Sequence, residues 1–199
     1  MSQIETVNVA GIGKLKLGDY LHTRLRSAIR PSTTQSTELN FYQTIPGSAI
    51  PGDTTTNLTQ YDTNLKQADG LPPGWAALVY YMSVWLPATC TLADAQDVNA
   101  KTLLQLVIGS TNKVLDDGHF QHFPPGSGLS LFSTASNQVL VNNAAPTGSA
   151  RTPYALPHLI SSDPKVPFRL TCTFTSALAL GTRMTWYSAL EGIIRQPVG

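Results

Sequence analysis

Two histidines three positions apart, His119 and His122, come closest to a metal-binding pattern, with Asp116 and Asp117 just before them. Histidine and carboxylate side chains are common zinc ligands, so this group is the first candidate for chemistry. Residues 118–123 are expected to form a strand, however, and residues three apart on a strand point to opposite faces. Without a bulge the two imidazoles would not converge on one ion. We therefore expect exposed or interface histidines here and predict no metal ligands.

The chain contains none of the common nucleophile or phosphate-binding motifs. Gly-x-Ser-x-Gly, GxxxxGK[ST] and GxGxxG are all absent. Cys90 and Cys172 have no adjacent histidine, and Cys172 alternates with apolar Leu170 and Phe174, which favours a buried free thiol over a disulfide. The triplet DDG at 116–118 is interpreted as a hairpin turn. We therefore predict no enzymatic activity, no catalytic residues and no cofactor.

Basic residues gather near the N-terminus of an otherwise weakly charged chain. Only 13% of the 199 residues are charged, about half the usual share, and the formal net charge is +1. This balance implies no global attraction to nucleic acid or to a membrane surface. Against Glu5 and Asp19, however, the first 31 positions hold five basic residues. We take these five as the candidate assembly site: Lys14, Lys16, Arg24, Arg26 and Arg30.

The basic segment is predicted to contain a short helix. Apolar residues recur every four positions, at Leu17, Leu21, Leu25 and Ile29. This spacing is typical of an amphipathic helix over about residues 18–30, which Pro31 would end. Its arginines would form either the solvated face of a docking helix or a contact for anionic lipid headgroups or nucleic acid. The sequence leaves both interpretations open.

The rest of the chain alternates as β-strands do, between turns rich in proline and glycine. The triplet PPG at 72–74 and again at 124–126 predicts a rigid turn at the end of a strand. A short helix near 94–100, with Thr91 or residues 93–94 as its cap, and a helical turn near 64–68 are also expected. The predicted strands cover residues 39–44, 75–86, 102–108, 118–123, 129–132, 138–141, 166–176 and 183–195.

These elements predict an all-β fold, an antiparallel two-sheet sandwich in the form of a single jelly roll. An extended and helical N-terminal arm with a polar linker would occupy residues 1–38, and the β-sandwich domain residues 39–199. The first residues, MSQIETVNVAGIG, lack the basic and apolar regions of a signal peptide. We therefore expect a protein that is made in the cytoplasm.

Three stretches of sequence carry a resemblance to a known family. NFYQTIPG is followed by TNLKQADGLPPGWAALVYYMSVWLP and, after a gap, by HFQHFPPGSGLSL. The order of an aromatic strand, a polar TN segment and a Pro/Gly turn into a long apolar strand resembles the jelly-roll capsid proteins of tailless icosahedral bacteriophages. The resemblance covers about residues 40–131 and implies one barrel per chain with no catalytic residues.

The leading hypothesis is a structural virion protein, a major or minor capsid subunit located in the virion. It would assemble through its loops and N-terminal arm with copies of itself and other capsid proteins, without a small-molecule substrate. The alternative is a β-sandwich receptor- or carbohydrate-binding module of a phage spike or fibre. A third hypothesis, an enzyme of the cupin type, lacks the His-x-His pair and glutamate that precede the cupin Pro-x-Gly turn.

Overall fold

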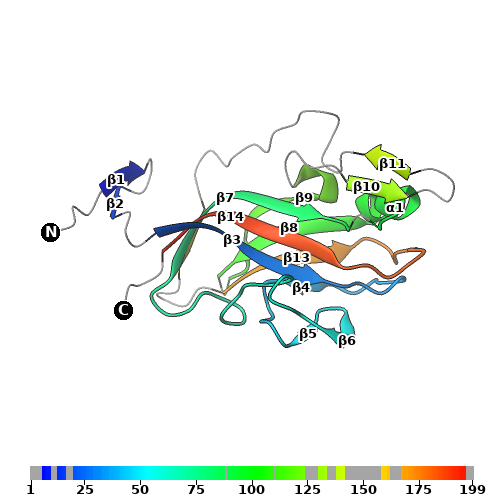
Figure 1. Cartoon of the computed structure of the whole chain (residues 1–199), viewed down its shortest axis with the longest axis horizontal. Helices are drawn as coiled ribbons and strands as arrows, with labels where there is room; N and C mark the ends of the chain where they lie inside the picture. The colour runs from blue at the N-terminus through cyan, green and yellow to red at the C-terminus, as the bar shows by residue number, and fades with distance from the viewer. Residues whose placement is uncertain are drawn as a thin grey trace.

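Two four-stranded antiparallel sheets make up most of the fold (Figure 1). The structure, a computed structural model, describes residues 6–9, 13–16, 20–87, 89–109, 111–123, 130–133, 138–141, 158–161 and 167–195. The first sheet has the order β12 (His158–Ser161), β7 (Ala76–Trp85), β14 (Trp186–Arg195) and β3 (Tyr20–Ile29). The second sheet has the order β4 (Leu39–Phe41), β13 (Phe168–Phe174), β8 (Thr102–Ile108) and β9 (Lys113–His119).

The eight strands pair like one long antiparallel hairpin that is folded back on itself. In chain order the first strand pairs with the last, β3 with β14, and the second with the seventh, β4 with β13. The third pairs with the sixth, β7 with β12, and the fourth with the fifth, β8 with β9. Successive pairs belong alternately to the first and the second sheet. Within each sheet the two pairs are joined by one further pairing, β14 with β7 in the first sheet and β13 with β8 in the second.

Three short hairpins accompany the two sheets. The described strands pair as β1 (Thr6–Val9) with β2 (Gly13–Lys16), β5 (Ala49–Ile50) with β6 (Asp53–Asn57), and β10 (Ser130–Ser133) with β11 (Gln138–Val141). In Figure 1 the β1–β2 hairpin lies at one end of the sandwich, and helix α1 (Leu92–Lys101) lies at the other end.

The core lies between the two sheets, where large apolar side chains exclude water. Trp186 of β14 is fully buried, and its ring packs against Phe120 at 5.4 Å and Phe174 at 6.1 Å between centroids. On β13 the predicted alternation is confirmed, because Phe168, Leu170 and Cys172 are buried and face this core. Each large apolar side chain buried in this way contributes about 1.5–3 kcal/mol.

Cys90 and Cys172 are both free and buried, which confirms the predicted free thiol at Cys172. Burial raises the pKa of both thiols, that of Cys90 to about 12. Neither sulfur is therefore a thiolate at neutral pH, and both residues act as small apolar side chains in the core.

A β-bulge shapes the first sheet at Gly192. The register between β14 and β7 shifts there, so that Glu191 pairs with Tyr81 and Gly192 with Val79. A Cβ atom at position 192 would lie 1.8 Å from the carbonyl oxygen of Leu78. Only glycine fits this close approach, and the bulge adds twist to β7 and β14.

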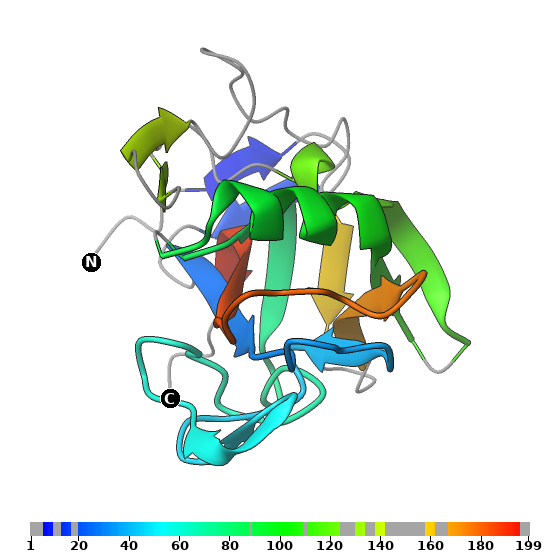
Figure 2. The same cartoon turned by 90° about the vertical axis from the view of Figure 1, so that its right-hand side faces the viewer.

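Helix α1 confirms the short helix predicted near residues 94–100, with Thr91 as its cap. The Thr91 hydroxyl accepts a hydrogen bond from the N–H of Asp94 at 3.1 Å. The carboxylates of Asp94 and Asp97 in turn accept backbone N–H groups of Gly181 and Ala179. The helix thus fixes the loop before β14, and it crosses one end of the sandwich (Figures 1 and 2). No helix of the described residues has the length and apolarity needed to cross a membrane.

The predicted helix over residues 18–30 is wrong, because residues 20–29 form strand β3 and pair with β14 along their whole length. Four-residue spacing of apolar side chains fits a strand as well as a helix, since four is also a multiple of two. The ladder to β14 pairs one side of the β3 backbone and places the strand at an edge of the first sheet.

Three other local predictions also differ from the structure. DDG at 116–118 is not a turn, because these residues lie inside β9. The turn before β9 uses positive φ angles at Gly109 and Asn112 instead. The strand predicted over 118–123 ends at His119, where a 3₁₀ helix begins (η2, Phe120–His122), and residues 64–68 form no helical turn. The turn at 72–74 is confirmed by the bond from Trp75 N–H to the Pro72 carbonyl, whereas 124–126 lies outside the described residues.

Candidate functional site

Strand β3 directs its arginines to the outer face of the first sheet. Arg24 and Arg26 alternate with Leu25 and Ser27, which are buried on the inner face, and Arg30 follows the end of the strand. The two predicted lysines lie elsewhere, on β2, where Lys14 pairs with Asn8 and Lys16 with Thr6 of β1. The structure therefore brings the three arginines together in one row, and it places the lysines in a separate hairpin.

Arg24 forms an ion pair across the sheet. Its Nε lies 3.4 Å from Oε2 of Glu191 on β14, directly opposite in the strand register. The Arg24 side chain is 57% exposed, whereas that of Glu191 is 10% exposed. Because the Arg24 guanidinium group lies mostly in water, the pair contributes about 0–1 kcal/mol.

Arg30 belongs to a partly buried cluster that we call the Asp53 clasp, formed by Arg30, Asp53 and Arg183. The carboxylate oxygens of Asp53 lie 3.5 Å from Arg30 Nη1 and 3.4 Å from Arg183 Nη1. The Asp53 side chain is only 3% exposed. Its pKa falls to about 2, because the hydroxyl and the backbone N–H of Thr55 donate to it and Arg183 adds positive charge.

The clasp also joins three backbone segments. Arg183 donates to the carbonyl oxygens of Arg30, Pro31 and Gly52, so one guanidinium group connects the end of β3, the β5–β6 hairpin and the loop before β14. Gly52 is required at this point. It has a φ of +91°, and a Cβ atom there would lie 2.6 Å from the Arg30 carbonyl oxygen. The Asp53 clasp therefore has a structural role, because it holds these three segments together.

Asn64 covers the open edge of β3 with its side-chain amide. Oδ1 accepts the N–H of Arg26 at 2.7 Å, and Nδ2 donates to the carbonyl of Arg24 at 2.6 Å. The amide therefore makes the pair of bonds that a neighbouring strand would make. Covering an edge in this way removes a site for unwanted strand pairing and holds the loop against β3.

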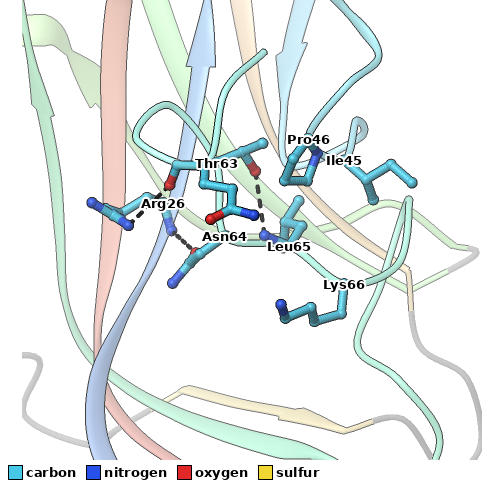
Figure 3. A pocket seen from close by; sticks show the side chains of 8 residues that line it. Arg26, Ile45, Pro46, Thr63, Asn64, Leu65 and Lys66 are labelled. Carbon is cyan, nitrogen blue, oxygen red and sulfur yellow. Dashed lines mark hydrogen bonds between the residues drawn. The ribbon is translucent and has the colours of Figure 1, made fainter.

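A pocket of about 390 Å³ lies beside this contact (Figure 3). Its apolar wall consists of Ile45, Pro46 and Leu65. Gln60, Thr63 and Asn64 supply polar groups, and Arg26 and Lys66 supply two positive charges. Sequence reasoning selected Arg26 from its charge but missed the other residues, because the loop that carries them has no periodic pattern.

The two histidines are closer together than the sequence predicted. Since η2 begins directly after His119, the chain turns, and the rings of His119 and His122 meet edge to face with centroids 5.8 Å apart. Nδ1 of His119 lies 3.2 Å from the Thr102 carbonyl oxygen. The expectation that the rings point to opposite faces is therefore wrong. Among the described residues, no group of three or more histidine, cysteine or carboxylate side chains is placed to hold a metal ion.

Aromatic side chains also reach the outer face of the first sheet. Trp85 of β7 and Tyr187 of β14 stack with centroids 5.7 Å apart and ring planes at 19°. Partial burial and the nearby charge of Asp62 raise the pKa of the Tyr187 hydroxyl. Both rings are half-buried, and the Tyr187 hydroxyl lies near enough to Arg30 of the Asp53 clasp to feel its charge.

Comparisons with known proteins identified no match for this chain. No family model matches the chain, and neither a curated protein nor a solved structure matches it.

Proposed function

We propose that this protein is a structural subunit of a virion shell with a single jelly-roll fold. The order of the eight main strands carries the proposal, since their nested pairing across two four-stranded sheets is the pairing expected of a jelly roll. Viral capsid proteins use this architecture, as do lectin domains and cupins. The resemblance of residues 40–131 to phage capsid proteins favours the capsid among these three.

Composition and surface fit such a role. A shell subunit is covered by its neighbours on several sides, so a chain with only 13% charged residues is easier to explain in an assembly than as a free monomer. Its partners would be copies of itself and other shell proteins. The β1–β2 hairpin with Lys14 and Lys16, at one end of the sandwich, is the part of the proposed arm that would reach a neighbour, an internal membrane or the genome (Figure 1).

Electron microscopy and size-exclusion chromatography of the purified chain, alone and with candidate shell partners, test this proposal. We expect shells, or the pentameric and hexameric capsomers from which shells form. A protein that stays monomeric under all assembly conditions would contradict it.

A test of the N-terminal arm requires a deletion that leaves β3 in place. Removing residues 1–31 would remove a strand of the first sheet, whereas removing residues 1–16 leaves β3 and its ladder intact. We expect the shorter deletion to fold normally, as shown by circular dichroism, and to stop assembly at capsomers. Normal shells from this variant would show that the arm is not the tie between subunits.

The stacked pair Trp85 and Tyr187 favours a second candidate function, a receptor- or carbohydrate-binding module of a spike or fibre. Sugars stack on exposed aromatic rings, and each ring here is half-exposed on a sheet face. A discrete trimer that binds glycans, with binding lost in Trp85→Ala, would support this module over the shell subunit.

A further inference from the structure

Arg26 differs from Arg24 and Arg30 in having no carboxylate partner within the described residues. Arg24 pairs with Glu191, and Arg30 pairs with Asp53. Arg26 makes one side-chain hydrogen bond, from Nη2 to the Gln60 carbonyl at 3.2 Å. A guanidinium group has five N–H donors, so most of its capacity is left for another acceptor.

A second cation lies on the same pocket. Lys66 is exposed, and in Figure 3 Arg26 and Lys66 stand on opposite sides of Asn64 and Leu65. None of the residues that line the pocket is acidic. The neighbouring Asp62 accepts from the N–H and the hydroxyl of Thr59 through Oδ2, in a turn of its own. The pocket therefore carries positive charge without an internal counterion.

The walls of the pocket are fixed before any ligand arrives. Asn64 binds the backbone of β3 on both sides of Leu25, and Thr63 and Leu65 are buried. The Thr63 hydroxyl donates to the Thr44 carbonyl and accepts the Leu65 N–H, each at 3.4 Å. Little free energy would be lost in ordering these side chains when a ligand binds. Small-molecule pockets are typically preformed in this way.

We propose that this pocket binds a small organic anion, a carboxylate or phosphate carried on a body of about the size of a sugar ring. The fork of Arg26 matches the paired oxygens of either group, and Lys66 adds a second charge. Ile45, Pro46 and Leu65 offer an apolar wall to the body of the ligand. The volume of about 390 Å³ lies near the lower end of the range for ligand sites. This inference does not depend on assembly, because it concerns the single subunit.

Binding can be measured by NMR titration of the full chain with two acids and their neutral counterparts. N-acetylneuraminic acid and glucose 6-phosphate supply the carboxylate and the phosphate, and N-acetylglucosamine and glucose are the neutral controls. We expect at least one acid to bind with a dissociation constant of about 1 mM or below, to shift the Arg26 and Asn64 amide signals, and to weaken as salt is added. The acid that binds more tightly identifies the source of the anionic group.

Variants at the two cations locate the site. Lys66→Gln removes an exposed charge that makes no hydrogen bond or ion pair within the described residues, so we expect normal folding and about three- to tenfold weaker binding. Lys113→Gln is the matched control. Lys113 is also exposed but lies on β9, away from the pocket lining, so this variant should bind as the wild type does. Arg26→Lys keeps the charge but loses the fork, and should weaken binding by about tenfold.

Three results would overturn the proposal. These are the absence of saturable binding for both acids, equal binding of the acids and their neutral counterparts, and equal affinities for the Lys66→Gln and Lys113→Gln variants. The measurement uses the unassembled chain, so failure to form shells would leave this result unaffected and would count only against the shell function.

Discussion

Arg26 and Arg30 extend from the same face of the first sheet, yet their surroundings are opposite. Arg30 ends in the Asp53 clasp, where the carboxylate is 3% exposed and two guanidinium groups neutralise it. Arg26 ends at a pocket that offers it one backbone carbonyl and no carboxylate within the described residues. Two residues of the same type, four positions apart, therefore have a structural role in one case and a free charge in the other.

The difference shows how charge on this strand divides between folding and recognition. A matched and buried charge is committed to the fold, because removing its partner leaves an ion out of water without compensation. An unmatched charge in an open pocket costs the fold little and stays available to a ligand. The sequence alone groups all three arginines together, and only the contacts separate them.

The largest expected effect comes from Asp53→Asn. The amide still accepts from Thr55 but carries no charge, so Arg30 and Arg183 lose their counterion. We expect the melting temperature to fall by about 5 °C or more. Thermal unfolding followed by circular dichroism measures it.

Asp62→Asn is the matched control for this change. Asp62 also accepts from the N–H and the hydroxyl of a threonine, but no arginine forms an ion pair with it in the described structure. Its melting temperature should stay near that of the wild type. Equal losses in the two variants would show that the clasp is no more structural than an ordinary turn.

Acid should weaken the clasp in a defined window of pH. The folded-state pKa of Asp53 is about 2, below the ordinary value of about 3.9 for an unfolded aspartate. Its carboxylate therefore stabilises the fold fully above about pH 4, and this contribution is lost as the pH falls toward 2. In urea titrations between pH 5 and 2, the stability difference between wild type and Asp53→Asn should shrink. A difference that stays constant over this range contradicts the assignment.

A medium effect is expected from Asn64→Ala, which frees the β3 edge beside the pocket. Two hydrogen bonds to the backbone are lost, but water can replace them because the contact is only partly buried. We expect a loss of about 1–2 kcal/mol and faster hydrogen exchange at the Arg26 amide. Asn57→Ala, at an exposed residue of β6, should change neither. Unchanged exchange at Arg26 in Asn64→Ala would mean that the pocket wall is not held by this amide.

Much of the β framework was predictable because its signals are local. On β13, Phe168, Leu170 and Cys172 alternate with polar residues, and β8 falls on the predicted residues 102–108. Helix α1 follows from the Thr91 cap. By contrast, the four-residue spacing on β3 suits both a helix and a strand, and the partner that decides between them, β14, lies at the far end of the chain.

The candidate site was less predictable, because its contacts are long-range. Arg183 reaches a carbonyl 131 positions away at Gly52, and no sequence pattern connects the two. Gly118 was interpreted as part of a turn, although it lies in β9 where a Cβ atom would meet His122 Nδ1 at 2.5 Å. A glycine that lies close under a neighbouring side chain looks the same in sequence as a glycine required by a turn.

The smallest effect should come from Lys66→Gln, which tests whether the pocket charge is truly separate from the fold. The side chain is exposed and has no partner among the described residues, so we expect the free energy of unfolding to stay within about 0.5 kcal/mol of the wild type. Arg24→Gln removes an exposed guanidinium group from its pair with the less exposed Glu191, and should cost about 1 kcal/mol. Urea denaturation resolves both values. A loss above 1 kcal/mol in Lys66→Gln would mean that the lysine contributes to folding, and the contrast between the pocket and the Asp53 clasp would then fail.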